Sequence, residues 1–196
     1  MLTFVLFLVL GYLSGSIPFG FIIPKIKGID IRKIGSKGTT ATNVARALGW
    51  RWGILVALLD ILKAIIPTYL AARPYIINPW QVSLIALTPT VGHIFPVWLN
   101  FKGGRGASTF FGASLVLVGP KFLILSFVIW ITILILFKIV SLTNLLFAWI
   151  FSLLLLVFFP WYFIYGILGS SLITLALREN IQRLKKGEEP KISLKW

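Results

Sequence analysis

The stretch FLILSFVIWITILILF, residues 122–137, determines how often the chain can cross a membrane. It has no charged residue, but its 16 residues fall short of the roughly 20 that a spanning helix needs. The apolar stretch before it, residues 107–119, is shorter still, and Gly119-Pro120 separates the two. The pair is either two short helices broken at Gly119-Pro120 or one kinked, partly re-entrant element. We interpret it as two helices.

Five more apolar stretches flank this pair, at residues 1–23, 52–72, 79–99, 142–159 and 161–177. Of the 196 residues, 58% are hydrophobic and 12% are charged, and the mean hydropathy is +0.96. Soluble domains are about 45–50% apolar and about 25% charged, and one of this size could not bury so much apolar surface. The sequence therefore predicts an all-α integral membrane protein with about seven transmembrane helices. We expect a single membrane domain over residues 1–196, with a retained first helix rather than a signal peptide.

The net charge of +14 indicates the orientation of the chain. With seven helices the connections alternate between the membrane faces, and all but three of the 19 Lys and Arg residues fall on one face. They lie in a loop at about residues 25–51, in the loop 100–106, at Lys138 and in a tail at about residues 178–196. Because basic loops stay in the cytoplasm, we predict a cytoplasmic loop and tail, an external N-terminus and a cytoplasmic C-terminus. The charge then needs no nucleic-acid partner to explain it.

Few side chains are available for catalysis. The chain has no Cys, one His and two Asp, which excludes thiol nucleophiles and disfavours a metal site. The G-x-x-x-x-G-K-[ST] pattern of P-loop ATPases is absent, and so is the G-x-S-x-G motif of serine hydrolases. The His-x4-Asp acyltransferase motif is also absent, because Trp98 stands where its Asp would be. Any catalysis must rest on positioning and on positive charge.

Three predicted helix starts on the cytoplasmic face are accompanied by residues that suit phosphate. Helix N-termini carry unpaired N–H groups and partial positive charge, and glycine lets the backbone approach a ligand. Ser, Thr, Lys and Arg side chains donate hydrogen bonds to phosphate oxygens. The arrangement predicts a cytosolic phosphate site at the membrane surface. The residues are Gly35–Asn43 with Arg46, Lys102–Thr109 and Ser141–Asn144, joined from the tail by Asn180 and Arg183.

Each of these features also has a structural explanation. Glycine-rich basic loops are often simple turns, and Ser141 at a helix start can be a plain N-cap. Asp60 and Lys63 share one face of a helix, where a buried ion pair is the simplest interpretation. His93 can be a hydrogen-bonded core residue, and segment 178–184 can be an interfacial helix that binds anionic headgroups. From the residues alone these alternatives stay open.

Four motifs resemble those of one family. They are Gly92–Pro96 with Phe101–Thr109, Ala41–Asn43 with Arg46, Asp60 with Lys63, and the tail from Asn180 to Lys191. They are similar to G-H-x-F-P…F-K-G-G-K-G-x-A-T, G-A-T-N-x-x-R, D-x-x-K and N-I-x-R-L-x-x-G-x-E-x-K of the PlsY family. These are bacterial membrane glycerol-3-phosphate acyltransferases that use acyl phosphate as donor. The resemblance covers nearly the whole chain. It implies seven helices in the bacterial inner membrane and transfer of a fatty acyl group to glycerol 3-phosphate, giving lysophosphatidate and phosphate.

The resemblance also implies roles for particular residues. We expect no cofactor, no metal and a monomer whose partners are acyl phosphate, glycerol 3-phosphate and membrane lipid. Acyl phosphate would be held by Ser36, the amides of residues 37–40, Ser141 and Lys102. Glycerol 3-phosphate would be held by Arg46, Arg105 and Asn180. The expected catalytic residues are Ser36, Arg46, Lys102, Arg105 and Asn180. The expected substrate-binding residues are Lys37, Gly38, Thr39, Thr40, Thr42, Asn43, His93, Gly103, Gly104, Gly106, Thr109, Ser141 and Arg183.

The chain departs from the family pattern in three places. Gly35–Thr40 differs from the family's G-S-G-N-x-G, and Arg105 replaces a Lys, which keeps the charge but changes its geometry. Ala176 and Leu177 stand where the family usually carries Arg-His. These departures motivate an alternative, a non-catalytic or weakly active paralogue that binds acyl phosphate or phosphorylated lipid. An anion transporter is a weaker alternative, because few charged residues lie inside the predicted helices.

Overall fold

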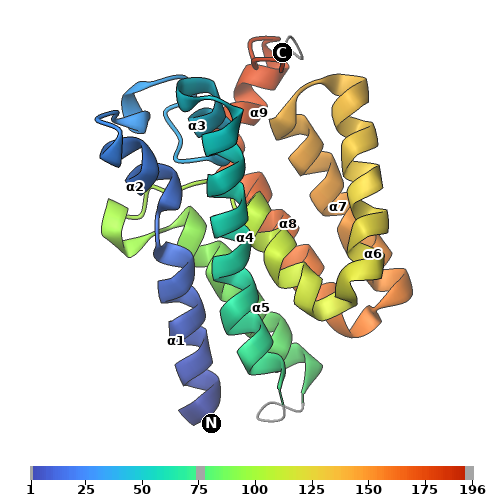
Figure 1. Cartoon of the computed structure of the whole chain (residues 1–196). Helices are drawn as coiled ribbons and strands as arrows, with labels where there is room; N and C mark the ends of the chain where they lie inside the picture. The colour runs from blue at the N-terminus through green and yellow to red at the C-terminus, as the bar shows by residue number, and fades with distance from the viewer. Residues whose placement is uncertain (1, 74–77, 193–196) are drawn as a thin grey trace.

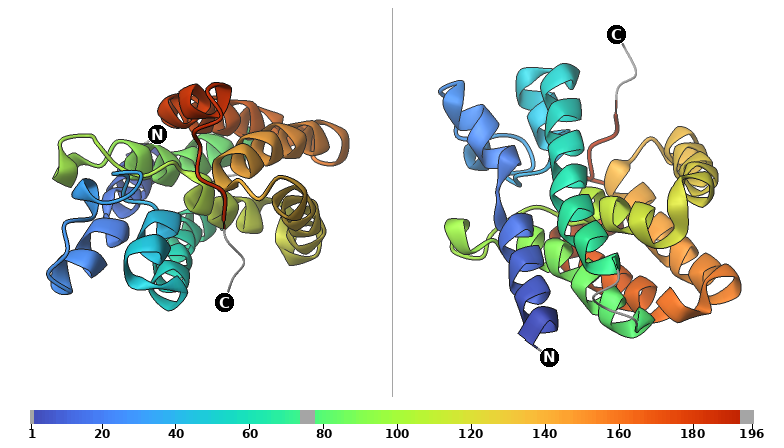
Figure 2. Two further views of the ribbon diagram at one scale, coloured as in Figure 1. Left: turned by 90° about the horizontal axis from the view of Figure 1, so that it is seen from above. Right: turned by 60° about the horizontal axis from the view of Figure 1, so that its bottom comes forward.

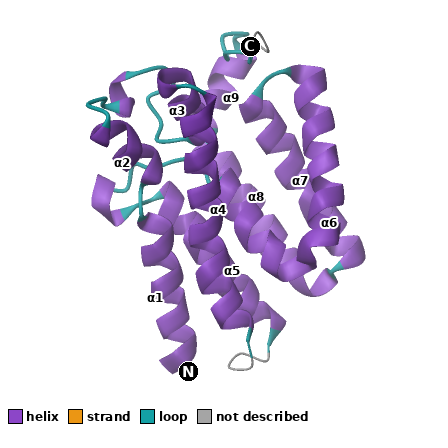
Figure 3. Cartoon of the chain, viewed as in Figure 1, coloured by secondary structure: helices purple, strands orange, loops and turns teal. Residues whose placement is uncertain are grey.

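The computed structural model describes residues 2–73 and 78–192, and within them the regular structure is helical (Figure 3). Short 3-10 turns stand at Ile31–Lys33, Val97–Leu99 and Pro160–Tyr162. The predicted tail is described only to Ile192, since residues 193–196 lie outside the described part, as do residues 1 and 74–77. The α-helices are α1 (Leu2–Ser16), α2 (Phe19–Ile26), α3 (Ala41–Leu48), α4 (Trp50–Ala72), α5 (Pro79–Ile94), α6 (Ala107–Phe137), α7 (Val140–Phe158), α8 (Phe163–Ala176) and α9 (Arg178–Lys185).

The long helices form one bundle (Figure 1). The chain begins at one end of the bundle, and α3, α9 and the start of α7 lie at the opposite end (Figure 1). In the described part of the chain, five helical stretches are long and apolar enough to cross a bilayer. A sixth arises if the bent pair Pro160–Ala176 and Arg178–Lys185 counts as one span. The all-α membrane class is confirmed, whereas the count of seven spans and the orientation stay predictions.

Helix α6 breaks where the sequence predicts a break. Gly119 has φ 78° and ψ 166°, which is not helical, and Pro120 follows it. Proline lacks the N–H that would continue the helix, and glycine can adopt the positive φ that the bend requires. The stretches 107–119 and 122–137 therefore form two helical segments joined at a sharp bend, as Figure 1 shows.

Two other predicted boundaries are wrong in part. The predicted first helix over residues 1–23 is divided at Ile17-Pro18, so α1 and α2 are separate helices. Pro18 has no N–H for the helix and restricts the residue before it. The predicted helix over 79–99 ends at Ile94, shortly before Pro96, for the same reason. The loop at 25–51 also contains a helix of its own, α3.

Small residues let the helices pack closely. A Cβ added at Gly15 would overlap the backbone of Pro89, and one at Gly92 would overlap the backbone of Tyr12 and Ser16. Lipid tails give no hydrophobic drive for helix association, so close backbone approach and interhelical hydrogen bonds supply much of it. An example of such a bond is the one between the Ser152 and Ser170 hydroxyls, at 2.7 Å. The contact between α1 and α5 therefore depends on glycine.

An aromatic cluster fills the core between α6, α7 and α8. The ring of Phe110 stacks on Tyr165 at 4.8 Å between centroids and meets Phe151 edge-on at 5.7 Å. The Tyr165 hydroxyl donates a hydrogen bond of 2.6 Å to the carbonyl of Phe110, so the buried phenol is satisfied. This cluster holds the first turn of α6, which reaches the site described below.

Gly92→Ala tests the α1–α5 contact. The added methyl has no room against the α1 backbone, so we expect a loss of about 1–3 kcal/mol in the free energy of unfolding. The matched control is Val9→Ile, which also adds one carbon but at a position of α1 that is 49% exposed. Thermal unfolding in detergent measures both. Equal melting temperatures for the two variants would contradict the close packing.

Candidate active site

The first loop is wrapped around one buried amide. The Asn43 Nδ2 group donates to the carbonyls of Ile31, Ile34 and Gly38 at 3.3, 3.0 and 3.0 Å, and its Oδ1 accepts from the backbone N–H of Ser36 at 3.1 Å. The side chain is fully buried, and these contacts occupy its polar atoms. Asn43 therefore shapes the loop, rather than facing a ligand as the sequence suggested.

The first glycine-rich loop, Gly35–Thr40, leads into α3 and not into the long helix α4. Thr40 is the N-cap of α3, where its hydroxyl accepts a hydrogen bond of 3.2 Å from the backbone N–H of Asn43. Gly49, with φ 94°, ends α3 and separates it from α4. The helix expected over residues 52–72 begins at Trp50, directly after Gly49. Glycine at positive φ commonly ends a helix, so α3 and α4 are separate.

The second loop packs on His93. The N–H groups of Gly103 and Gly104 donate to the carbonyls of Ile94 and His93 at 3.1 and 3.0 Å. A Cβ at Gly104 would collide with the imidazole of His93, so only glycine lets the loop run across this ring. Gly106, with φ 82°, is the N-cap of α6. Both glycine-rich loops thus end at a helix N-terminus, the second at the predicted helix and the first at α3 instead of the predicted long helix.

A carboxylate of the tail joins the third helix start. Glu189 accepts hydrogen bonds from the Ser141 hydroxyl at 2.8 Å, from the Asn180 amide at 2.6 Å and from the Arg183 Nε at 2.7 Å. The N–H of Ile192 donates to the carbonyl of Lys138 at 2.8 Å. Seen from above, the tail runs from α9 between α3 and α7 (Figure 2).

Sequence reasoning missed Glu189 as a site residue. The signal was present in the spacing Asn180, Arg183, Glu189 at the end of the tail motif. Partial burial alone would raise the pKa of Glu189, but the hydrogen bonds from Asn180, Ser141 and Arg183 outweigh it. The pKa therefore lies below its ordinary value, and Glu189 is ionised at neutral pH.

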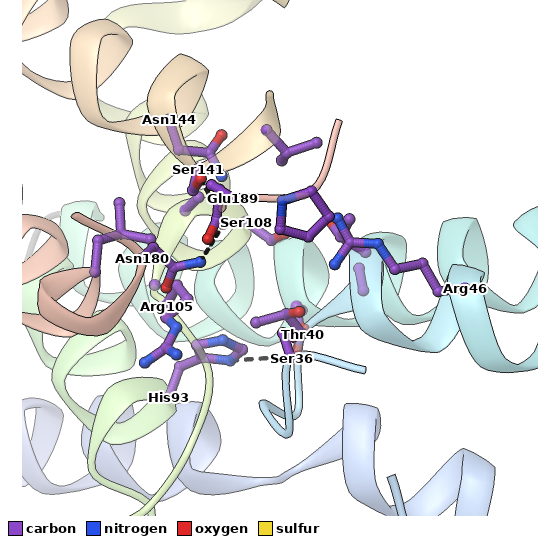
Figure 4. Close-up of a pocket in the computed structure, with 18 residues that line it drawn as sticks. Ser36, Thr40, Arg46, His93, Arg105, Ser108, Ser141, Asn144, Asn180 and Glu189 are labelled. Carbon is purple, nitrogen blue, oxygen red and sulfur yellow. Dashed lines mark hydrogen bonds and ion pairs between the residues drawn. The ribbon is translucent and has the colours of Figure 1, made fainter. Parts of the chain in front are cut away.

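The three helix starts converge on one cavity (Figure 4). Its wall includes the first residues of α3, α6 and α7, which are Ala41, Ala107 and Val140. Their unpaired N–H groups and positive dipole ends suit an anion. The predicted site residues on its wall are Ser36, Thr40, Thr42, Arg46, His93, Arg105, Gly106, Ser141 and Asn180. Ser108 and Asn144, from the predicted phosphate-binding segments, also line it, and unpredicted residues include Asp60, Leu177 and Glu189.

A second cavity adjoins the first. Ser36 and Arg105 line both, so the two cavities meet at these side chains. Arg105 donates to the carbonyl of Ala176 at 2.6 Å and lies 3.4 Å from the Glu179 carboxylate. The other predicted residues on its wall are Lys37, Gly38, Thr39, Lys102, Gly103 and Gly104.

Three expected substrate-binding residues line neither cavity within the described chain. Besides Asn43, these are Thr109, whose hydroxyl donates to the Gly106 carbonyl at 2.9 Å, and Arg183, which pairs with Glu189. Their polar groups hold the loops and the tail in place. Residue type alone cannot distinguish such internal hydrogen bonding from binding to a ligand.

The predicted buried ion pair is confirmed. Asp60 and Lys63 lie 2.7 Å apart, and their side chains are 2% and 3% exposed. Lys63 also donates to the carbonyl of Ile17 at 2.7 Å, at the break between α1 and α2. The pair therefore joins α4 to the end of α1.

Asn43→Asp tests the role of the buried amide. A carboxylate cannot donate to three carbonyls, so we expect the amides of residues 35–40 to exchange with solvent at least about tenfold faster. The matched control is Asn144→Asp, because the Asn144 Oδ1 only accepts a bond from Trp130 and an Asp can do the same. Hydrogen exchange that is unchanged in Asn43→Asp would refute this role.

The lowered pKa of Glu189 predicts that the tail is held less firmly against α7 at acidic pH. A carboxyl whose pKa is lowered on folding stabilises the fold above its ordinary pKa of 4.5, and this contribution is lost as pH falls through the lowered value. We expect the exchange protection of the Ile192 amide to decline on acidification and to be weak at every pH in Glu189→Gln. Glu188→Gln, at the exposed neighbouring residue, is the control and should behave like the wild type. If the Ile192 amide stays protected in Glu189→Gln, the hydrogen bonds of Glu189 do not hold the tail in place.

Known proteins resemble this chain along its length. A sequence model described as glycerol-3-phosphate acyltransferase matches residues 5–187. A glycerol-3-phosphate acyltransferase of Aquifex aeolicus is 40% identical over 189 residues, which cover 94% of this chain and 97% of that protein. The glycerol-3-phosphate acyltransferase 2 of Thermotoga maritima is 40% identical over 192 residues, covering 96% of each chain.

Solved structures agree in fold. A crystal structure of PlsY (YgiH), an integral membrane glycerol 3-phosphate acyltransferase, in its glycerol 3-phosphate form has a TM-score of 0.92 and 36% identity, covering 97% of this chain and 96% of that one. The lysophosphatidic acid form has a TM-score of 0.89. With these matches, its helical fold and its cavity at three helix N-termini, the chain belongs to the glycerol-3-phosphate acyltransferase family.

Proposed function

We propose that this protein transfers a fatty acyl group from acyl phosphate to glycerol 3-phosphate, giving lysophosphatidate and phosphate. The observation that carries the proposal is the meeting of three helix N-termini and two guanidinium groups, Arg46 and Arg105, at one cavity. Such a site suits a phosphate ester. The relatives named as glycerol-3-phosphate acyltransferases support the same acceptor.

The two adjoining cavities suggest a place for each substrate. In the proposal, Arg46 and Asn180 hold the phosphate of glycerol 3-phosphate in the first cavity. Lys102 and the amides of residues 37–39 hold the phosphate of acyl phosphate in the second. Ser36 and Arg105 stand between them. Ser141, expected beside acyl phosphate, lines the first cavity, and its hydroxyl donates a hydrogen bond to Glu189.

The reaction needs little more than positioning. The acceptor hydroxyl oxygen attacks the acyl carbon, the bond from that carbon to the phosphate oxygen breaks, and phosphate leaves with the electron pair. A phosphate oxygen of a substrate takes the hydroxyl proton. Orientation of two bound substrates can supply about 7–11 kcal/mol, and Arg105 with the helix N-termini can neutralise the charge on the leaving phosphate.

The proposal also covers where the protein lies in the cell and its oligomeric state. The bundle would lie in the bacterial inner membrane as a monomer, with the site at the cytoplasmic face. The basic first loop and tail, which stand at the same end of the bundle as α3 and α9, support this orientation (Figure 1). The non-catalytic paralogue suggested by Leu177 has less support, because relatives about 40% identical carry the name of the enzyme.

Purified protein tests the proposal directly. With acyl phosphate and radiolabelled glycerol 3-phosphate it should form lysophosphatidate, and acyl-CoA or acyl carrier protein should not replace the donor. Arg46→Ala should reduce turnover by at least about 100-fold, since a charged hydrogen bond to substrate is lost. Arg51→Ala is the control, because Arg51 lies over the ring of Trp50 and lines neither cavity in the described chain. Turnover no higher than that of Arg46→Ala would rule out the enzyme.

A further inference from the structure

A buried carboxylate lies in the wall of the first cavity, where three helix N-termini favour an anion. Asp60, on α4, is only 1% exposed, yet it lines this cavity. A carboxylate weakens the binding of phosphate, because two anions repel each other. Glu189, also on the wall, is satisfied by three hydrogen bonds that hold the tail. The position of Asp60 therefore calls for a role other than binding phosphate.

The ammonium group of Lys63 holds one oxygen of this carboxylate. The Asp60 Oδ1 lies 2.7 Å from the Lys63 Nζ and 3.5 Å from the His93 Nδ1, and this oxygen is fully buried. In the described chain both polar contacts of the carboxylate use Oδ1. Oδ2 is thus the oxygen that remains for a ligand in the cavity. Because an ionised carboxylate only accepts hydrogen bonds, that ligand must present a donor.

Asp60 lies on the side of the cavity where the two substrates would meet. Figure 4 shows the His93 ring near Ser36, across the cavity from Ser141 and Glu189. Because Asp60 contacts the His93 ring, it lies on the same side. Ser36 lines both cavities, so this side adjoins the one proposed for acyl phosphate. The glycerol part of glycerol 3-phosphate, which carries the reacting hydroxyl, would therefore lie next to Asp60.

Glycerol 3-phosphate has two hydroxyl groups that can donate a hydrogen bond. The C1 hydroxyl is the one that is acylated in the proposed reaction, and its proton goes to a phosphate oxygen. A carboxylate paired with an ammonium group is a weak base, so it is not suited to take that proton. The C2 hydroxyl keeps its proton throughout the reaction and can donate a hydrogen bond to a carboxylate oxygen.

We infer that Asp60 makes the acceptor site specific for glycerol 3-phosphate, because its Oδ2 accepts a hydrogen bond from the C2 hydroxyl. The inference rests on the proposed function, since it places this substrate in the first cavity. Lys63 is a positioning residue that holds Oδ1 through the ion pair. A phosphate ester without the C2 hydroxyl leaves the buried carboxylate without a donor, and this weakens its binding.

Substrate analogues test the inference in the wild-type protein. 2-Hydroxypropyl phosphate keeps the C2 hydroxyl and lacks the C1 hydroxyl, whereas 3-hydroxypropyl phosphate has the reverse pattern. Each analogue competes with radiolabelled glycerol 3-phosphate for the purified protein in detergent. The first should bind within about threefold of glycerol 3-phosphate, and the second at least about tenfold more weakly. Equal affinities for the two analogues, or the reverse order, would overturn the inference.

A double substitution assigns this preference to Asp60. Asp60→Leu with Lys63→Met replaces the ion pair by apolar side chains, so that neither charge is left buried alone. The affinity for glycerol 3-phosphate should fall at least about tenfold, whereas that for 3-hydroxypropyl phosphate should change by less than about threefold. Equal weakening of both ligands would show a purely structural pair and overturn the inference.

Two further variants complete the test. In Asp60→Asn the amide oxygen pairs with Lys63, which only donates, so an NH2 group takes the place of Oδ2. The preference for 2-hydroxypropyl phosphate over the other analogue should then fall below about threefold, even if the double variant does not fold. Thr68→Val is the matched control and should keep the wild-type preference. It removes a buried hydroxyl of α4 that donates to the Ala64 carbonyl, and Thr68 lines neither cavity in the described chain.

These binding measurements do not depend on turnover. A protein that prefers 2-hydroxypropyl phosphate but forms no lysophosphatidate overturns the proposed acyl transfer and supports the role of Asp60. A protein that is active but binds the two analogues equally well overturns the role of Asp60 alone.

Discussion

The structure depends on the need to satisfy one ammonium group inside an apolar bundle. Lys63 cannot be left unpaired there, because an isolated buried charge costs several kcal/mol. Its partners are the Ile17 carbonyl at the end of α1, Asp60 on α4 and His93 on α5. The hydroxyl of Ser14 also donates to the Lys63 carbonyl at 2.7 Å. Three helices are thus joined at one level of the bundle, and the second glycine loop packs on the His93 ring at that level.

The position of the site follows from this arrangement. The loop that packs on His93 places the N-terminus of α6 at the cavity. The loop wrapped around Asn43 places the N-terminus of α3 there. With the start of α7 they provide backbone donors and partial positive charge without further side chains. A chain with only five carboxylates and one histidine has little else to use for catalysis. An activated acyl donor suits such a site, because it demands orientation and charge neutralisation more than a strong base.

Much of the architecture could be predicted from local sequence. Apolar stretches showed where the long helices lie, Gly119-Pro120 marked the break in α6, and glycine with basic residues marked two of the loops at the site. The role of Asn43 could not be predicted, because its carbonyl partners depend on the path of the loop. Glu189 was missed since its three donors meet only after the chain bends by 64° between α8 and α9. Such contacts depend on tertiary geometry, which spacing along the chain does not contain.

A structure of the protein with glycerol 3-phosphate bound would test whether three helix N-termini form the phosphate site. We expect phosphate oxygens within hydrogen-bonding distance of Arg46 and Asn180, next to the first turns of α3, α6 and α7. A phosphate bound at the opposite end of the bundle, with these helix starts unliganded, would show that they do not form the phosphate site.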